Sequence, residues 1–424
     1  MEGQLPVDDV PDAKGIDTAA EVETGTLPAA PQPPSPIPGI SRNVFILGIT
    51  SFLTDLSTEM IYPLVPLFLT SVLGAPFFVV GLIEGIAEST ASTLKIFSGW
   101  LSDRMRRRLP LTVLGYGISA LAKPLLAAAT VWPAVLALRF GDRLGKGIRN
   151  PPRDALIADS SPPSSRGRVF GFHRTMDTAG AALGALTALA ALGLMGERYR
   201  LIFLISAIPA ALGVGSLFLV REHVHPHKRT RPPRLSLSQL DHRFKMFLLA
   251  SAIFSLGNSS DAFLILRAKN LGLSAFAAVF AYVIYNVVYG AVSMPAGSLS
   301  DRIGRRRIIA AGFVVFSLVY LGFAIAGGAA LVWPLFAIYG LYMAMTEGVG
   351  KAFAADMAPA RIRGTAMGTY QTVIGLLSFF ASLIAGILWD AIGPYAPFIF
   401  GAGLSLLAAG VLLAALGNKA AASV

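Results

Sequence analysis

Two carboxylates lie one helical turn apart in the stretch TDLSTEMIYP, residues 54–63. The surrounding residues 43–73 are otherwise apolar, and ionised side chains are costly inside hydrocarbon. Residues four positions apart share one face of a helix, so Asp55 and Glu59 are predicted to face the same interior space. Two buried acids this close tend to hold a single proton, because burial and like charge both disfavour ionisation. The pair is therefore our first candidate for a site that takes up and releases a proton.

A second group of charges lies in residues 138–154, which read LRFGDRLGKGIRNPPRD. The charges recur at spacings of three and four, so they largely share one helix face, which must line water or meet partner charges rather than lipid. They are Arg139, Asp142, Arg143, Lys146, Arg149 and Arg153. Pro151 and Pro152 follow Asn150 and are expected to break or kink the helix.

The two groups of charges are expected at similar depth in a membrane. At a rise of 1.5 Å per residue, Asp55 lies about 18 Å along its helix and Arg143 lies about 17 Å in from the opposite surface. In a hydrocarbon core of about 30 Å these positions overlap near the middle. The two acids are therefore expected either to exchange protons or bind solute beside the basic face, or to be paired permanently with its arginines and lysine as structural bridges.

Other polar residues in apolar stretches extend the candidate cavity. In the first half of the chain the candidates are Glu84, Glu88, Arg174 and Asp177, and in the second half they are Asn258, Asp261, Tyr285, Tyr289, Glu347, Lys351 and Gln371. Lys95, Lys123, His173, Arg267 and Asn286 also lie on or near apolar stretches but are not assigned to the cavity. The acid and the lysine at 347 and 351 lie one turn apart and either neutralise each other or contact solute. The tyrosines at 285 and 289 either pack or line the cavity.

Twelve apolar stretches must position these residues. The chain is 54% hydrophobic and only 14% charged, whereas soluble proteins carry about 25% charged residues. Each stretch approaches the roughly 20 residues that cross a bilayer as a helix. They are residues 43–73, 77–101, 111–131, 132–160, 169–195, 201–220, 244–266, 275–299, 308–326, 331–355, 366–389 and 398–416. We predict an all-α polytopic membrane protein, in which the charged fourth and fifth stretches carry the weakest hydropathy signal.

Basic residues, which give a net charge of +11, cluster in alternate connections between the stretches. This asymmetry is typical of cytoplasmic loops, so we predict a cell-membrane protein with both termini in the cytoplasm, and no nucleic-acid partner. Residues 1–42 lack the basic start and apolar core of a signal peptide and are predicted to be a disordered cytoplasmic tail. The absence of cysteine excludes disulfides and thiol chemistry.

A basic linker is predicted over residues 221–243, and a second short tail over residues 418–424. The linker carries His223, His225 and His227, whose alternate spacing suits no structured metal site without further ligands. We therefore predict a solvated linker, and neither a metal nor a cofactor.

The chain repeats itself. GWLSDRMRRR at residues 99–108 recurs as GSLSDRIGRRR at residues 297–307, an offset of 198 positions. A second pattern, D-x-x-P-x-x-x-R-G-x-x-x-G, begins at Asp159 and again at Asp356, an offset of 197 positions. Transport proteins are often built from such internal repeats. Two motifs at nearly one offset predict two six-helix halves in the same orientation, residues 43–220 and 244–417.

The doubled G-x-L-x-D-R-x-G-R-R pattern resembles the best-known motif of the major facilitator superfamily. The resemblance covers about residues 43–417 and implies two helix bundles around a central cavity that opens to each side in turn. It also implies a cytoplasmic gate of ion pairs. Its candidate residues are Asp103, Arg104, Arg107, Asp159, Arg166, Asp301, Arg302, Arg305, Asp356 and Arg363. Basic residues at this end otherwise only fix the topology, which is the interpretation we favour for Arg106 and Arg108.

Three local features qualify the resemblance. Arg106 stands where the family motif has glycine, whereas the second copy keeps Gly304. Arg143, four residues before a glycine, resembles a family motif whose arginine is implicated in proton coupling. Gly180 and Gly184 resemble an antiporter motif, but Ala185 replaces its proline, which weakens the case for export; close helix packing explains the glycines equally well.

We predict a secondary transporter, coupled to protons, that moves a small polar or charged organic solute, with export slightly favoured. Many charges of both signs favour an anionic or zwitterionic solute. The pattern also resembles a broad group of prokaryotic superfamily members whose substrates are poorly characterised, so it names none. The predicted partners are the solute, protons and the lipid bilayer, and the chain is predicted to be monomeric.

Two other classes are weighed against a transporter. One is a non-transporting sensor of the same fold, for which the tails and linker offer no signalling domain. The other is a membrane-embedded transferase, which needs a nucleophile and a base at one depth. His173 is the only histidine near a membrane stretch, and no serine–histidine–aspartate pattern accompanies it. We therefore predict that the protein is not an enzyme.

Overall fold

The computed structural model describes residues 37–104, 107–162, 165–222, 241–358 and 363–415, without the side chains of residues 96, 103 and 363–365. Most of the predicted N-terminal tail, the linker histidines, Arg106 and the C-terminal tail lie outside these ranges.

The described secondary structure is helical throughout. The first group of helices comprises α1 (Arg42–Ile61), η1 (Tyr62–Leu64), α2 (Val65–Ser71), α3 (Phe77–Arg104), α4 (Leu109–Ala128), α5 (Trp132–Asp159), α6 (Arg166–Met195) and α7 (Tyr199–Leu217). The second group comprises α8 (His242–Gly257), α9 (Ala262–Asn270), α10 (Ala275–Ile303), α11 (Arg305–Ile325), η3 (Ala329–Leu331), α12 (Val332–Asp356), α13 (Arg363–Ala391) and α14 (Ala396–Ala415).

Eleven candidate spans within the described residues are long and apolar enough to cross a membrane. Residues 42–71, 242–270 and 329–356 each count as one span. The helix α5 is long enough, but it is the most charged helix and falls below the hydropathy of the others. With α5 the spans number twelve, and the predicted all-α membrane fold is confirmed.

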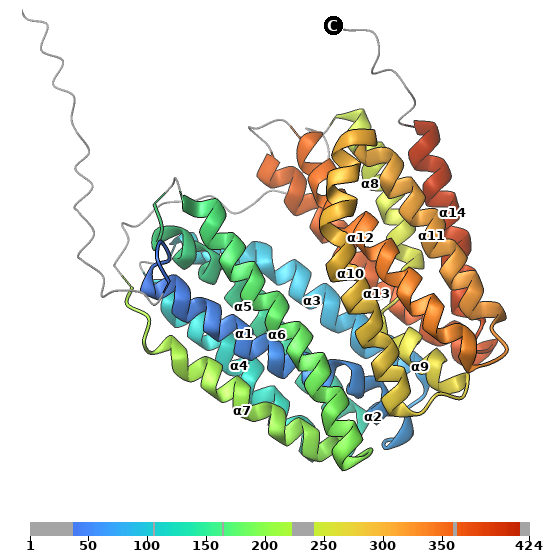
Figure 1. Ribbon diagram of the computed structural model, residues 1–424, viewed down its shortest axis with the longest axis horizontal. Helices are drawn as coiled ribbons and strands as arrows, with labels where there is room; N and C mark the ends of the chain where they lie inside the picture. Colours follow the sequence, from blue (N-terminus) through green and yellow to red (C-terminus); the bar gives the residue numbers. More distant parts are fainter. Residues whose placement is uncertain (1–36, 105–106, 163–164, 223–240, 359–362, 416–424) are drawn as a thin grey trace, which may run out of the picture.

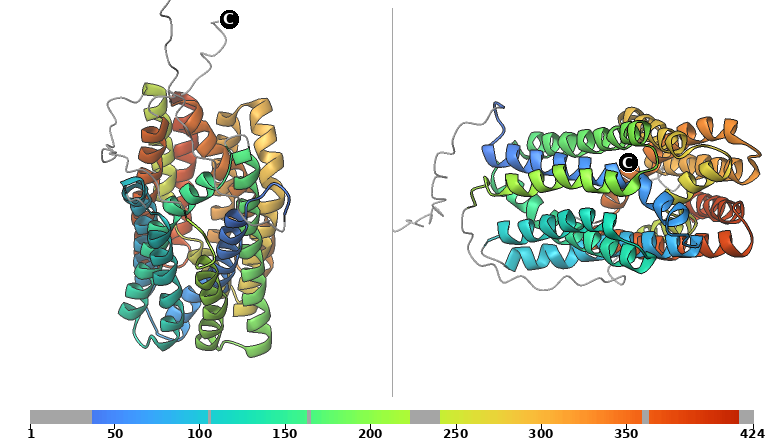
Figure 2. Two further views of the ribbon diagram at one scale, coloured as in Figure 1. Left: turned by 90° about the vertical axis from the view of Figure 1, so that its left-hand side faces the viewer. Right: turned by 90° about the horizontal axis from the view of Figure 1, so that it is seen from below.

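The two groups stand beside each other and are splayed (Figure 1). The two groups converge where α2 packs against α9. They separate toward the C-terminal ends of α3 and α12 (Figure 1). Between the groups, α3 packs along α13 and α6 packs along α10, and Figure 2 shows the same pairing of halves from two further sides. We call the end that carries Arg108 and Arg305 the arginine-rich end, and the end that carries α2 and α9 the opposite end.

Glycine permits the close contact of α6 with α1. A Cβ atom at Gly180 would lie 2.3 Å from the carbonyl oxygen of Phe52, and one at Gly184 would lie 2.4 Å from that of Leu56. Real atoms do not approach so closely, so only glycine fits at this crossing. The packing interpretation of this glycine pair therefore accounts for both residues.

The helix α5 continues through its two prolines, so of the two expected outcomes a break is wrong, and a kink stays a prediction. Pro152 lacks the N–H that would bond the carbonyl of Ile148 four residues earlier. The hydroxyl of Ser98 on α3 donates to that carbonyl instead, at 2.5 Å. A neighbouring helix thus satisfies the freed backbone group, which is how prolines are tolerated in membrane helices.

Candidate functional site

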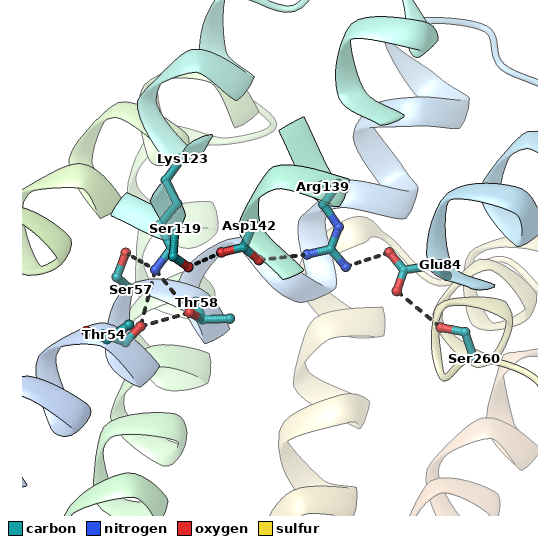
Figure 3. A network of polar contacts seen from close by, with 9 residues as sticks. All are labelled: Thr54, Ser57, Thr58, Glu84, Ser119, Lys123, Arg139, Asp142 and Ser260. Carbon is teal, nitrogen blue, oxygen red and sulfur yellow. Dashed lines mark hydrogen bonds and ion pairs between the residues drawn. The ribbon is translucent and has the colours of Figure 1, made fainter. Parts of the chain in front are cut away.

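A chain of buried charges crosses the middle of the first group. Arg139 on α5 is fully buried, and its Nη2 donates to Glu84 Oε1 on α3 at 2.7 Å. Its Nη1 lies 3.9 Å from Asp142, which accepts a short hydrogen bond from Ser119 on α4 (Figure 3). The other oxygen of Glu84 accepts from Ser260 of the second group at 3.5 Å. Arg139 thus lies between two carboxylates, which supply the counter-charge that a buried cation needs.

Lys123 on α4 ties α4 to α1, and among the described residues it has no direct acidic partner. Its side chain is fully buried, and Nζ donates to the hydroxyls of Ser57 and Thr58, each at 3.0 Å, and to the carbonyl of Thr54 at 3.3 Å (Figure 3). We did not place Lys123 in the candidate site from the sequence. A lysine in an apolar stretch was the available signal, because such a residue must find polar partners.

Asp55 and Glu59 lie half-buried on α1, beside the basic face of α5. Within the described part of the chain neither makes an ion pair; Glu59 accepts only a hydrogen bond from the Tyr282 hydroxyl of α10, at 3.2 Å. Both acids interact electrostatically with Lys146 on α5. The structure thus brings the predicted acids and the basic face together, but it assigns the direct pairing with Arg139 to other carboxylates.

Three charged side chains on α3 and α5 make no direct ion pair among the described residues. Arg143 is buried, and its Nε has no hydrogen-bond partner among the described residues. Lys146 makes neither a hydrogen bond nor an ion pair in the same part of the chain. Glu88 on α3 is exposed and interacts electrostatically with both cations. Opposite charges that lie near one another without a direct ion pair can respond to the arrival of a proton or a charged solute.

The helix α6 contributes two of the predicted residues. Asp177 lies 3.6 Å from Nδ1 of His173, whose Nε2 contacts Ser51 at 2.9 Å. Arg174 is exposed and interacts electrostatically with Glu347 of the second group. Asp177 therefore belongs to the same polar zone as Asp55, with which it also interacts, whereas Arg174 faces the second group.

The second group contains a cavity of about 330 Å³ whose lining includes Asn258, Glu347, Lys351 and Gln371. Glu347 accepts from Lys351 at 2.9 Å and from Tyr289 at 2.7 Å, so the two charges at 347 and 351 neutralise each other and also line the cavity.

Two further predicted residues of the second group are not part of the cavity lining. Asp261 accepts a hydrogen bond from Tyr339 at 2.7 Å. Tyr285 is buried in ring contacts with Tyr282 and Tyr339. Tyr285 therefore packs, whereas Tyr289 positions an acid of the cavity.

Contacts between the two groups gather from the middle to the opposite end. The carboxylate of Asp390 on α13 accepts from the backbone N–H groups of Phe77 and Phe78, at 3.1 and 2.7 Å. Lys269 on α9 donates to Ser71 at 2.8 Å. Sequence reasoning missed both, because neither residue lies in a motif. A carboxylate at a helix N-terminus is stabilised by the helix dipole and by the free N–H groups.

Ion pairs at the arginine-rich end join residues of the same group. Arg305 pairs with Asp356 at 2.5 Å and with Asp301 at 3.2 Å. In the first group Arg108, not Arg107, pairs closely with Asp159. The first repeat has Arg106 where the second has Gly304, whose φ of 97° suits glycine, and the paired arginine lies one position later. Arg108 therefore does more than fix topology.

The remaining predicted gate residues with described side chains are exposed: Arg104, Arg107, Arg166 and Arg302. The guanidinium of Arg104 lies 5.8 Å from the ring centroid of Trp100. The side chains of Asp103 and Arg363 lie outside the described part of the structure.

Two groups of membrane-spanning helices that meet at one end and separate at the other, with charges between them, define a class of alternating-access membrane transporters. The sequence model of the Major Facilitator Superfamily matches residues 47–266 and 246–423, and the chain belongs to this superfamily.

Relatives and solved structures agree with this membership. The chain is 38% identical to an uncharacterized MFS-type transporter of Methanocaldococcus jannaschii, MJ1317, over 380 residues that cover 88% of this chain and 95% of that protein. It is 26% identical to the multidrug resistance protein MdtH of Cronobacter sakazakii, covering 77% of this chain and 82% of MdtH. A crystal structure of the peptide transporter POT shares the fold, with a TM-score of 0.77 at 15% identity over 90% of this chain and 96% of that one.

Proposed function

We propose that the protein is a secondary transporter that couples the movement of a small polar or charged organic solute to protons. The observation that carries the proposal is the contrast among four acids. Glu84 and Asp142 are ion-paired with Arg139, whereas Asp55 and Glu59 face Lys146 without an ion pair in the described chain. A coupling acid must gain and lose its proton during the cycle, so it cannot be locked in a permanent salt bridge.

Protons and solute occupy neighbouring zones in this proposal. The first group holds the proton site at Asp55 and Glu59, with Arg143 and Lys146 as the cations that respond to it. The cavity of the second group holds the solute. Its mixed charges favour an anionic or zwitterionic solute over an apolar drug.

The orientation follows from charge. Arginine-rich connections favour the cytoplasmic side, so the arginine-rich end faces the cytoplasm, together with the predicted linker of residues 221–243 and both tails. In this orientation the structure is open toward the cytoplasm. Export is slightly favoured, because a 26% identical relative is named a multidrug resistance protein. Localisation in the cell membrane and a monomeric state complete the proposal.

Reconstituted liposomes test the coupling. Under an imposed pH gradient, candidate solutes are added and internal pH is followed together with solute uptake. We expect wild-type protein to move protons with solute, and Asp55→Asn or Glu59→Gln to abolish the proton movement. Glu197→Gln is the matched control, because this acid lies at the opposite end of the molecule, away from the proton site. Unchanged proton-coupled uptake in both acid variants would return the two residues to a structural role.

A further inference from the structure

The cavity of the second group has one wall from the first group. Its lining comes from α8, α11, α12 and α13, and α3 supplies Glu88, Ser92 and Lys95 across the gap. Its volume of about 330 Å³ lies near the lower end of the roughly 300–1,000 Å³ of small-molecule sites. The cavity therefore suits a small solute that touches both groups at once.

Aromatic rings form the apolar part of this cavity. Phe254 stacks on Phe313 with ring centroids 4.1 Å apart and planes at 10°. Phe247 stacks on Tyr370 at 5.6 Å and 11°. All four rings, and that of Tyr342, line the cavity. Most of these rings are buried and cover one another, so each offers only a small, fixed apolar surface to the cavity, and edge or offset contacts with such surfaces favour an aromatic ligand.

Two lysines from different groups supply the charged part. Lys351 on α12 is bonded to Glu347, whereas Lys95 on α3 makes no hydrogen bond or ion pair within the described chain. The two lysines interact electrostatically with each other. Like charges that face one cavity repel, and an anion between them relieves the repulsion through charge-assisted hydrogen bonds.

Asn258 provides an acceptor on the aromatic side. Its Nδ2 donates to the Tyr342 hydroxyl at 3.1 Å, but its Oδ1 is buried and has no partner in the described chain. A buried acceptor without a donor costs free energy, and a ligand that brings an O–H or N–H recovers it once the side-chain amide turns its Oδ1 toward the cavity. The residue lines the same cavity as the two lysines.

We propose that this cavity binds an aromatic amino acid or a close derivative whose ring carries an O–H or N–H. The carboxylate lies between Lys95 and Lys351, the ring lies among the aromatic side chains, and the ring substituent donates to Asn258. The ammonium group faces Glu88, two helical turns from Lys95 on α3. This assignment rests on the proposed transport function, for which it names the solute.

Binding of this solute also biases the conformation. Its carboxylate attracts lysines that belong to different groups, and these lysines lie on the side where the groups separate. A ligand shifts a conformational equilibrium by its difference in affinity for the two states. The bound solute therefore favours closure of the arginine-rich end around itself.

Ligand-induced stabilisation of the full-length protein in detergent tests the assignment. The midpoint of thermal unfolding is measured with L-tyrosine, tyramine, hydroxyphenylpropionate and L-leucine, because a ligand of the folded state raises it. We expect tyrosine to raise the midpoint most, hydroxyphenylpropionate to raise it less, and tyramine and leucine to leave it unchanged. No shift with either aromatic acid, or an equal shift with tyramine, overturns the proposal.

Variants assign the contacts. Lys95→Met and Lys351→Met are each expected to weaken tyrosine binding about 10-fold or more, because each removes a hydrogen bond between charged groups. Lys245→Met is the matched control, since this lysine is exposed on α8 and does not line the cavity. Asn258→Leu should weaken the binding of tyrosine but not that of phenylalanine. Full affinity in both lysine variants contradicts the proposed contacts.

The binding assay separates this inference from the proposed function. Asp55→Asn is expected to keep tyrosine binding while losing proton coupling. Tyrosine binding without any transport contradicts the transporter proposal alone. Proton-coupled transport of other solutes, with no binding of aromatic acids, contradicts the solute assignment alone.

Discussion

The contact of Asp390 with the start of α3 predicts a measurable effect on the conformational equilibrium. The residues before α3 are Ala75 and Pro76, whose side chains offer no oxygen to cap its free N–H groups. The carboxylate of Asp390 supplies that cap from the second group, 313 positions along the chain from Phe77. The cap exists only while the two groups touch at the opposite end, so it stabilises the state that is closed there.

The size of the effect follows from the geometry. Loss of an N-cap side chain costs about 0.5–2 kcal/mol, and a negative charge at a helix N-terminus contributes about 0.3–1 kcal/mol when exposed. Because Asp390 is exposed, we take the free-energy contribution of its cap from the lower part of the first range. We expect Asp390→Ala to lower the preference for the closed opposite end by about 1 kcal/mol, which is about fivefold in population.

Spin-label distance measurements in lipid nanodiscs report this population. The chain contains no cysteine, so Leu194→Cys and Ile325→Cys label the opposite end of each group without background. Asp390→Ala should increase the fraction of long distances. The control is Asp241→Ala. The Asp241 carboxylate caps α8 by accepting from the backbone N–H of Arg243, so its loss affects one group only. An unchanged distribution in Asp390→Ala, or the same change in the control, refutes this role of the cap.

Three further predictions concern stability, each measured as the midpoint of unfolding in detergent. Gly180→Ala places a methyl group against the backbone of α1 and should destabilise the protein strongly, whereas Gly171→Ala on the same helix meets nothing within 4 Å and should be neutral or stabilising by up to about 1 kcal/mol. Glu84→Gln removes the nearer of the two acids beside Arg139 and leaves Asp142 at 3.9 Å as the remaining counter-charge, so it should cost about 1–3 kcal/mol. Ser98→Ala leaves an α5 carbonyl unsatisfied and should cost about 1–3 kcal/mol, so a loss below a few tenths contradicts the role assigned to this serine.

The hydropathy of the chain and its repeat were sufficient to predict the fold. Long apolar stretches reveal membrane helices because hydrocarbon permits few other structures, and two motifs at one offset reveal the doubled architecture. The depth estimate also placed Asp55 beside the basic face of α5. Such an estimate is possible because the rise of a helix is fixed, so position along the chain converts directly into depth.

The choice of partners could not be predicted in the same way. Arg139 pairs with Glu84 of α3 rather than with the acids of α1, because the rotation of each helix about its axis depends on packing over its whole length. The pairing of Asp159 with Arg108 rather than Arg107 depends on a turn that lacks the glycine of the second repeat. Contacts between the groups, such as that of Asp390, join segments that share no motif.

The contacts between the two groups suggest how a proton changes the preferred state. The hydroxyl of Tyr282 donates to Glu59 across the groups at 3.2 Å. A hydrogen bond to an ionised carboxylate is roughly twice as strong as one between neutral groups. In the proposed coupling, release of a proton from Glu59 would strengthen this link and favour the closed opposite end, and uptake of a proton would weaken it. Because such coupling is reciprocal, the state that is open at the opposite end binds the proton more tightly. In the proposed orientation, with the arginine-rich end in the cytoplasm, a proton would then enter from outside and leave inside, a flow that can drive export by exchange or import by symport.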